Sequence, residues 1–220
     1  LVECEKNPTK AYRVNAVGTY NVALVAREIG ARVVYVSSSA VFDGKKSGQY
    51  VAEDLPDPQN HYGHSKYVGE LVVAGMMADH IIARTCWMFG GGPNGDRKFV
   101  AKILRQINKP SIEVITGKRG SPTYCKDFIG AVLGLVDEGK SGIFHISNIG
   151  APARADIARE IVRIAGSSAE IIEVGASVFE AEYTGTGVRG NESIASREIT
   201  LRPWQEALAE YIHTEWNETI

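Results

Sequence analysis

The sequence has no marked charge imbalance, and this limits the partners that it could have. Its 220 residues include 24 Lys and Arg against 26 Asp and Glu, a formal net charge of −2. We find no basic block and no basic amphipathic helix, so nothing indicates binding to nucleic acid. With 44% hydrophobic and 23% charged residues, the composition is that of a globular chain with one large domain, or one domain and a small companion.

Long apolar runs and paired cysteines are also lacking. No hydrophobic run approaches the roughly 18 residues that span a bilayer, and no signal-peptide pattern is present, so we expect no membrane association. The three cysteines, Cys4, Cys86 and Cys125, lack metal-type spacing and favour free thiols in a reducing cytoplasm. His61 and His64 are three residues apart without an evident third ligand, so we predict no metal.

What the sequence does contain is an alternation of predicted strands and helices. The short β-branched runs at residues 31–39 and 80–89 are typical of parallel strands buried on both faces. Further strands are predicted at residues 111–116, 142–148 and 170–174. Helices are predicted at residues 9–29, 62–77, 99–107, 127–139 and 155–166, and a last helix begins at Pro203. This alternation predicts an α/β fold built from right-handed βαβ units.

A tyrosine and a lysine form the clearest candidate site. Tyr62 and Lys66 in HYGHSKYVGE are four residues apart, which places both side chains on one face of the predicted helix. A neighbouring ammonium lowers the pKa of a tyrosine from about 10 and makes proton exchange with a carbonyl or alcohol oxygen feasible. Three serines at residues 37–39 follow a buried strand, at the edge where α/β sheets bind ligands. The pair alone fits a solvated helix face; with these hydroxyls it predicts a carbonyl-reducing or alcohol-oxidising site.

These motifs resemble those of the short-chain dehydrogenase/reductase superfamily. YGHSK matches its YxxxK motif, and NAVGTYN (15–21), VYVSSSAVFDG (34–44) and ARTCWMFG (83–90) resemble conserved blocks of its extended branch. Within that branch the chain most resembles the dTDP-4-dehydrorhamnose reductases. Further matching blocks, which extend the resemblance over essentially the whole chain, are RGSPTYCKD (119–127), GIFHISN (142–148) and LRPWQEALAEYI (201–212).

The resemblance implies a Rossmann-like doubly wound parallel sheet with a small C-terminal α/β substrate-binding region. Residues 1–90 and 126–148 would form the cofactor and catalytic domain, and residues 91–125 and 149–220 the substrate-binding region. The implied reaction is the reduction of a 4-keto-deoxysugar nucleotide, such as dTDP-4-dehydrorhamnose, by NADPH or NADH. The resemblance also implies a cytoplasmic enzyme with a nucleotide-sugar as its partner, and a homodimer is one possible assembly.

Carried over residue by residue, the resemblance assigns catalytic roles to Ser38, Tyr62, Lys66 and Asn15. Tyr62 would give a proton to the 4-keto oxygen, and Ser38 would hold the substrate carbonyl. Lys66 would lower the pKa of Tyr62 and bind the nicotinamide ribose. Asn15 would support the lysine through water, although a cap or tie within its own helix is the alternative.

The remaining implied contacts divide between cofactor and substrate. The cofactor would be bound by Ser37, Tyr62, Lys66 and Cys86, and the substrate by Ser39, Trp87, Thr123 and Arg189, the last at the diphosphate. Simpler roles stay open for several of them. Ser37 and Ser39 also suit hydrogen bonding within the turn, Cys86 suits a buried thiol, and Trp87 suits core packing.

The chain departs from the family pattern in two places. The family begins with a strand, a glycine-rich turn and a helix that binds the dinucleotide pyrophosphate, whereas GGGPNGD (90–96) follows a late strand and contains Pro93. We therefore expect such a segment to precede Leu1 in the natural protein, and dinucleotide binding to be poor without it. Glu192 stands where the family usually has an amide, which places an acid near a diphosphate.

Two other functions stay open on the sequence. An epimerase or dehydratase of the same architecture typically has extra acid/base carboxylates near its Ser-Tyr-Lys group, but Ser39 and Ala40 follow Ser38. A non-catalytic regulatory or binding subunit with this fold would explain the absent glycine-rich turn. The intact set of Ser38, Tyr62 and Lys66 favours the enzyme, and the fold alone does not decide between them.

Overall fold

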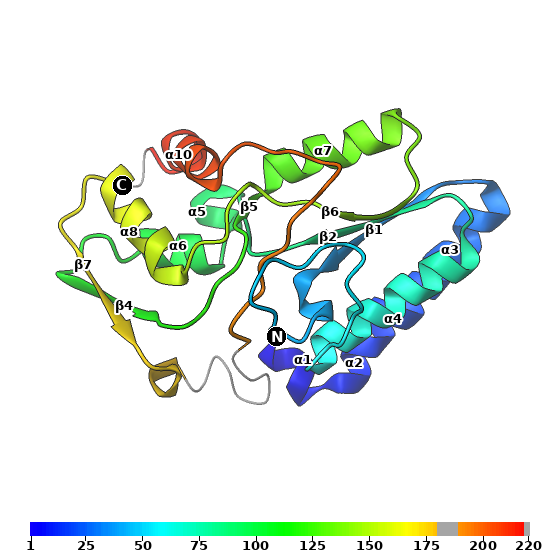
Figure 1. Ribbon diagram of the computed structural model, residues 1–220, viewed down its shortest axis with the longest axis horizontal. Helices are drawn as coiled ribbons and strands as arrows, with labels where there is room; N and C mark the ends of the chain where they lie inside the picture. The colour runs from blue at the N-terminus through cyan, green and yellow to red at the C-terminus, as the bar shows by residue number, and fades with distance from the viewer. Residues whose placement is uncertain (180–188, 218–220) are drawn as a thin grey trace.

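A parallel three-stranded sheet forms the centre of the computed structural model, which describes residues 1–179 and 189–217. Its strand order is β1 (Val33–Ser38), β2 (His80–Thr85) and β6 (Gly142–His145). Helices α3 (Gly18–Ile29) and α4 (His61–Met76) pack on one face, and α7 (Cys125–Asp137) packs on the other (Figure 1). The predicted α/β fold with a doubly wound parallel sheet is confirmed.

A second group of elements lies beyond the carboxyl ends of these strands (Figure 1). It contains two parallel pairs, β3 (Met88–Phe89) with β5 (Thr123–Tyr124), and β4 (Ser111–Ile115) with β7 (Glu170–Val174). Around them lie α5 (Gly92–Gly95), α6 (Phe99–Leu104), α8 (Arg154–Ile164), η3 (Ala176–Phe179) and α10 (Trp204–Glu215). The predicted domain boundaries stay a prediction, and residues 180–188 and 218–220 of the predicted substrate-binding region lie outside the described residues.

The helix predicted at residues 9–29 consists of several segments. After α1 (Val2–Lys6), α2 (Pro8–Tyr12) begins at a proline, and the π-helical turn η1 (Arg13–Val17) connects it to α3. Gly30 ends α3 in a left-handed conformation with φ of 69°, which is common for glycine at a helix C-terminus. π-Helical turns occur frequently at functional sites, and this one contains Asn15.

The prediction that the strand at residues 31–39 is buried on both faces is wrong. Val34 and Val36 of β1 are 37% and 43% exposed. The strand register places them beside Ile81 and Ala83 of β2, which are fully buried under α7. Among the described strands β1 pairs only with β2, and α7 covers β2 and β6 and leaves these edge valines open.

The single strand predicted at residues 80–89 is divided into β2 and β3. Trp87 lies between them with φ of 41°, and it is the one described residue other than glycine with positive φ. This left-handed conformation is rare for a bulky side chain, and it turns the chain out of the central sheet. The segment after Trp87 then pairs with β5 in the second group of elements.

A buried ion pair joins α4 to the central sheet. The carboxylate of Glu70 on α4 accepts hydrogen bonds from Arg84 Nη2 at 2.6 Å and Nε at 2.9 Å. The Ser37 hydroxyl on β1 donates to the same carboxylate at 2.5 Å. Both charged side chains are only 2% exposed, so their charges are compensated inside the protein.

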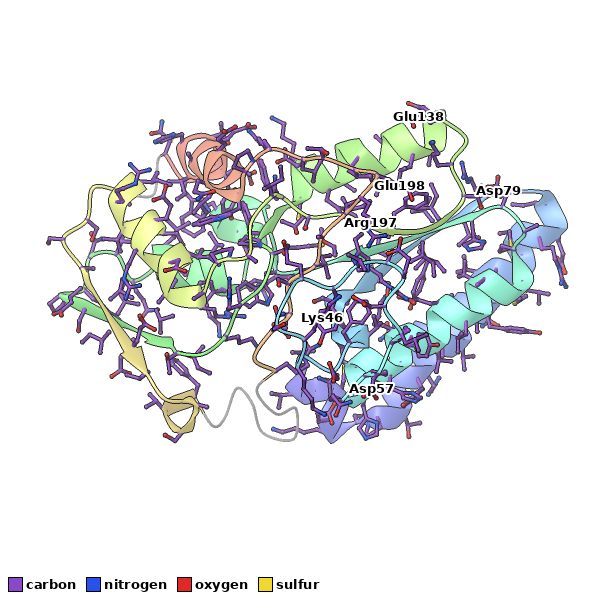
Figure 2. The ribbon with its side chains drawn as sticks, viewed as in Figure 1. Lys46, Asp57, Asp79, Glu138, Arg197 and Glu198 are labelled. Atoms are coloured by element: carbon purple, nitrogen blue, oxygen red, sulfur yellow. The ribbon has the colours of Figure 1, made fainter. Side chains whose placement is uncertain are left out.

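Exposed charged residues gather at the other end of the sheet. Figure 2 shows Asp79 and Glu138 at the loops that lead into β2 and β6, far from the carboxyl ends of the strands. Arg32 forms an ion pair with Asp79 at 3.0 Å in the same region. Within the described part of the chain, no helix is both long enough and apolar enough to cross a membrane.

Replacing Glu70 tests the ion pair. Glu70→Gln should lower the free energy of unfolding by about 3–5 kcal/mol, because it leaves the Arg84 guanidinium buried without a compensating charge. The measurement is urea unfolding followed by circular dichroism. The control Glu160→Gln breaks an ion pair with Arg163, whose side chain is 69% exposed, and should change stability little. Equal stability losses in the two variants would contradict this account.

Candidate active site

A cleft of about 1000 Å³ separates the carboxyl edge of the central sheet from the second group of elements. Ser38, Tyr62 and Lys66 line it on the side of the sheet, and Phe99 and Ile157 line it on the other side. Ligands of doubly wound sheets bind at this edge, so the cleft lies where the fold predicts a site.

Helix α4 and strand β1 bring Ser38 and Tyr62 together. Ser38 is the last residue of β1; its hydroxyl accepts the Ala40 N–H at 3.2 Å, and it lines the cleft together with Tyr62. The cap residue Asn60 accepts a hydrogen bond from the Gly63 N–H at 2.8 Å and fixes the start of α4. A Cβ atom at Gly63 would collide with the carbonyl of Ala40, so glycine permits the close approach of the helix to the strand end.

The pKa of Tyr62 differs from the expected direction. Burial raises it above the ordinary value of 10.0, and the neighbouring Ser38 side chain offsets only part of that effect. Desolvation of the phenolate is therefore the largest effect on this pKa, and the role of Lys66 in lowering it stays a prediction. Tyr62 keeps its proton at neutral pH, which is the state that a proton donor needs.

Lys66 lies over an aromatic ring that the sequence analysis missed. Its Nζ is 4.2 Å from the ring centroid of Tyr35, in the middle of β1. The Tyr35 hydroxyl donates to the backbone carbonyls of Asn15 at 3.3 Å and Lys66 at 3.2 Å. A single tyrosine within the β-branched run VVYVSS was the available signal. Burial lowers the pKa of Lys66 to about 8, although the charge of Glu70 acts in the opposite direction.

Asn15 lies next to Tyr35 and outside the cleft. Its Nδ2 donates to the Ser65 hydroxyl at 3.0 Å, which connects the π-helical turn to α4. It does not line the cleft, so its connection to the candidate catalytic residues passes through Tyr35 and the backbone of α4. The role of Asn15 in supporting Lys66 stays a prediction.

The other predicted site residues fall into two groups. Those that line the cleft are Ser37, Ser39, Trp87 and Arg189. Cys86 and Thr123 are buried elsewhere and do not line it. Burial raises the pKa of Cys86 to about 12, and its sulfur accepts the Ser121 N–H at 3.4 Å. The Thr123 hydroxyl donates to the Ser121 carbonyl at 3.2 Å. Their cofactor and substrate contacts stay predictions.

Glu192, the acid in place of the usual amide, has internal partners. Its carboxylate pairs with Arg189, accepts the Trp87 Nε1–H at 2.5 Å and lies 3.4 Å from Lys118 Nζ. Burial alone would raise the pKa of Glu192, but Arg189 and Lys118 together hold it below its ordinary value. The repulsion expected between this acid and a diphosphate is therefore countered by two neighbouring cations.

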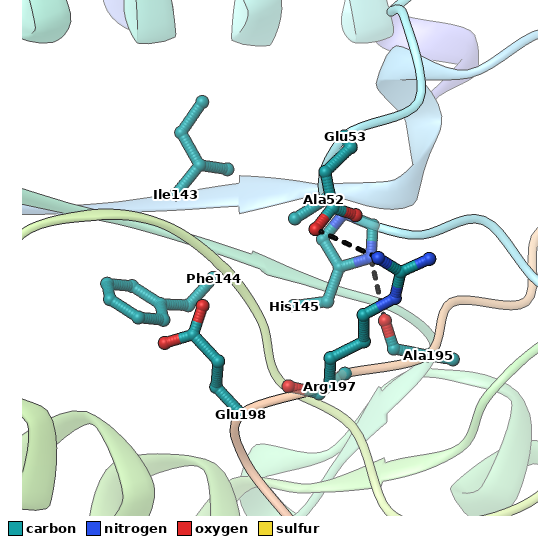
Figure 3. A pocket seen from close by; sticks show the side chains of 9 residues that line it. Ala52, Glu53, Ile143, Phe144, His145, Ala195, Arg197 and Glu198 are labelled. Atoms are coloured by element: carbon teal, nitrogen blue, oxygen red, sulfur yellow. Dashed lines mark hydrogen bonds and ion pairs between the residues drawn. The ribbon is translucent and has the colours of Figure 1, made fainter.

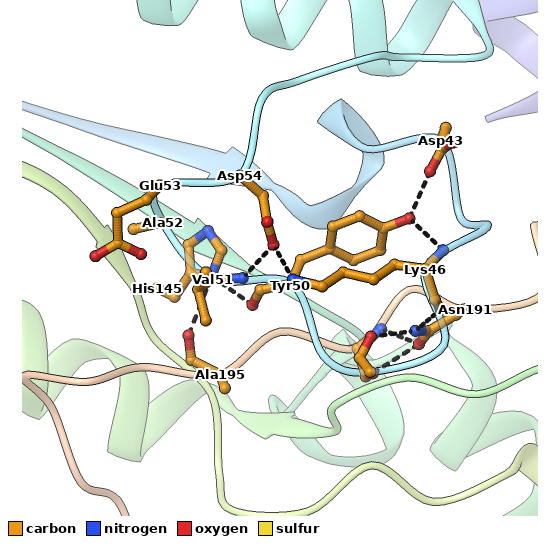
Figure 4. A network of polar contacts seen from close by, with 12 residues as sticks. Asp43, Lys46, Tyr50, Val51, Ala52, Glu53, Asp54, His145, Asn191 and Ala195 are labelled. Carbon is orange, nitrogen blue, oxygen red and sulfur yellow. Dashed lines mark hydrogen bonds and ion pairs between the residues drawn. The ribbon is translucent and has the colours of Figure 1, made fainter.

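A polar network supports the loop that carries Arg189 and Glu192 (Figure 4). Asn191 Nδ2 donates to the carbonyls of Lys46 at 2.7 Å and Gly48 at 2.8 Å. The Tyr50 hydroxyl donates to Asp43 at 2.5 Å within the same loop. The network connects residues 43–54 to residues 191–195 and fixes one side of the cleft.

A small cavity beside His145 lies at the back of this network and is lined by Glu53, Arg197 and Glu198 (Figure 3). His145 Nδ1 lies 3.1 Å from the carbonyl of Tyr50 and 3.2 Å from that of Ala195. Since both partners are acceptors, Nδ1 carries the ring proton. Burial lowers the pKa of His145 to about 4, so the ring is a neutral structural connection rather than an acid of the site. Among the described residues, no three His, Cys, Asp or Glu side chains are arranged to hold a metal ion.

Solved structures define the class of this chain as an extended short-chain dehydrogenase/reductase-type protein. The dTDP-4-dehydrorhamnose reductase of Yersinia enterocolitica is 33% identical, with a TM-score of 0.90 over 96% of this chain and 76% of that one. The Bacillus anthracis reductase, solved in complex with NADP, is 28% identical, with a TM-score of 0.89 over 96% of this chain and 75% of that one.

The sequence relatives give the particular family. The spore coat polysaccharide biosynthesis protein SpsK of Bacillus subtilis is 36% identical over 217 residues, which are 96% of this chain and 74% of that protein. The family model described as RmlD substrate binding domain matches residues 1–216, and the chain belongs to this family. It spans about three quarters of the length of these three relatives.

The titration of Lys66 tests the electrostatics of the site. Its ammonium should lose its proton near pH 8, whereas its ordinary value is 10.5. The folded state then binds fewer protons than the unfolded state between these values, so the contribution of Lys66 to stability should rise with pH across that window. NMR titration of lysine side-chain signals would measure the pKa, and Lys66→Met would assign the signal. A Lys66 signal that titrates above pH 10 would contradict the burial argument.

Proposed function

We propose that this chain forms the catalytic and substrate-binding part of an NAD(P)H-dependent reductase. Its substrate would be a 4-keto-deoxysugar nucleotide such as dTDP-4-dehydrorhamnose, and its product the corresponding alcohol. The convergence of Ser38, Tyr62 and Lys66 on one wall of the cleft carries this proposal. The reductases among its relatives support it.

The nicotinamide end of the cofactor fits the residues beside Tyr62. Among the described residues, no hydrogen bond or ion pair engages Lys66 Nζ, so its N–H groups are available to the hydroxyls of a ribose. The cofactor would supply the hydride when bound. The NADP complex of the Bacillus anthracis relative supports NADPH as the donor.

Proton delivery would then depend on this chain's own residues. Tyr62 is protonated at neutral pH, because its pKa lies above the ordinary value of 10.0, and it would donate this proton to the substrate carbonyl oxygen. The Ser38 hydroxyl, which lines the cleft with Tyr62, would hold the same oxygen. The phenolate that remains would be stabilised by Ser38 and by the positive charge of Lys66.

Reduction is favoured over epimerisation or dehydration by the residues around Ser38. The next two residues are Ser39 and Ala40, and the nearby acid Glu192 pairs with cations and the Trp87 indole. A carboxylate engaged in this way is poorly suited to act as an extra acid or base. Cytoplasmic localisation and a homodimer belong to the same proposal.

Replacing Tyr62 tests the proton donor. In the full-length natural protein, Tyr62→Phe should slow NADPH oxidation with dTDP-4-dehydrorhamnose by about a hundredfold to ten-thousandfold, because it removes the general acid. Circular dichroism should be unchanged, and absorbance at 340 nm would measure the rate. The control Tyr20→Phe alters an exposed tyrosine on α3 and should have normal activity.

Unchanged turnover in Tyr62→Phe would contradict the assigned role. If the unsubstituted full-length protein binds dTDP but never oxidises NADPH, the non-catalytic binding function replaces the reductase.

A further inference from the structure

The cationic side chains that line the cleft differ in burial and in whether they already pair with a carboxylate. Arg189 pairs with Glu192, and its Nη1 donates to the Ser39 carbonyl at 3.4 Å. It is buried, so binding an anion would require it to give up a compensated position. Lys118 is also buried and lies 3.4 Å from Glu192. The exposed cationic residues Arg97 and Lys98 line the cleft as well, on the segment before α6.

Arg154 is held in a different way. Its guanidinium carbon lies 4.6 Å from the ring centroid of Trp87 and 4.4 Å from that of Phe99. No ion pair joins it to a carboxylate of the described residues, although its charge helps to lower the pKa of the nearby Glu192, and its buried Nε has no hydrogen-bond partner there. Its backbone N–H donates to the Lys118 carbonyl at 3.1 Å and fixes the start of α8. Arginine suits this position because its planar, weakly hydrated charge stacks on aromatic faces.

Trp87, one of the two rings beside Arg154, is held by several contacts. Trp87 has a strained left-handed backbone, and its indole N–H is held by Glu192. Gly120 lies against the indole so closely that a Cβ atom there would collide with the ring. Glu192 is therefore a positioning residue for Trp87, and through the Trp87 ring it also positions the guanidinium of Arg154.

On the basis of the proposed function, we propose that Arg154, stacked between Trp87 and Phe99, binds the diphosphate of the nucleotide-sugar substrate. A guanidinium offers parallel N–H donors that match two phosphate oxygens. Arg154 can accept this anion without breaking an ion pair among the described residues, whereas the charge of Arg189 is already balanced by Glu192. The role at the diphosphate that the family resemblance assigned to Arg189 thus passes to Arg154, and Arg189 keeps Glu192 in place.

Calorimetric titration with dTDP and with thymidine separates the diphosphate contact from nucleoside recognition. Arg154→Met should weaken dTDP binding by about tenfold to a hundredfold, because it removes a charge-assisted, bidentate contact. Thymidine affinity should stay within about threefold of that of the unsubstituted protein. Arg154→Lys, which keeps the charge but loses the planar donor pair, should recover only part of the dTDP affinity.

The matched control is Arg159→Met, which removes one positive charge from the same helix. Arg159 pairs at the surface with Glu173 at 2.7 Å, and its loss should leave dTDP binding within about twofold. Arg154→Met with circular dichroism and dTDP affinity like those of the unsubstituted protein would overturn the assignment of Arg154 alone. If the unsubstituted protein binds dTDP no better than thymidine, recognition of a diphosphate in this cleft is overturned, and the nucleotide-sugar function fails with it.

Discussion

The buried carboxylate of Glu70 is the contact on which the arrangement of the candidate site depends. It accepts hydrogen bonds from Arg84 on β2 and from Ser37 on β1, so a single carboxylate on α4 connects the helix to two strands. Lys66 precedes Glu70 by one helical turn and Tyr62 precedes it by two, on the same face of the helix. Ser38 immediately follows Ser37 at the end of β1, and it lines the cleft together with Tyr62.

The two sides of the cleft differ in how their ionisable side chains are arranged. On the side of the sheet, burial keeps Tyr62 protonated and leaves Lys66 without an ion pair among the described residues. On the other side, Glu192 balances buried cations and holds Trp87, whose ring supports Arg154. The first arrangement suits transfer of a proton and the second suits binding of an anion. A nucleotide-sugar requires both, because its carbonyl and its diphosphate belong to one molecule.

Local patterns predicted the parts of the site that depend on short spacing. Tyr62 and Lys66 are one helical turn apart, and the serines follow a recognisable strand, so both features could be found without a structure. The helix end at Gly30 is local in the same sense. The exposure of Val34 and Val36 was not predictable, because it depends on whether a strand has neighbours on both sides.

Contacts between distant residues account for most of what the sequence did not predict. The Trp87 indole donates a hydrogen bond to Glu192, which is 105 residues away in the sequence. The left-handed conformation at Trp87 was not predictable either, because the residue is neither glycine nor proline. The stack of Trp87, Arg154 and Phe99 joins three separate segments. The raised pKa of Tyr62 follows from burial, which the spacing to Lys66 does not reveal.

The most direct test of the central claim is a crystal structure of the protein with dTDP-rhamnose. The account predicts that the 4-hydroxyl of the sugar lies within hydrogen-bond distance of both the Tyr62 hydroxyl and the Ser38 hydroxyl. A sugar bound in the same cleft with its 4-hydroxyl away from Tyr62 would contradict the assignment of that residue as the proton donor.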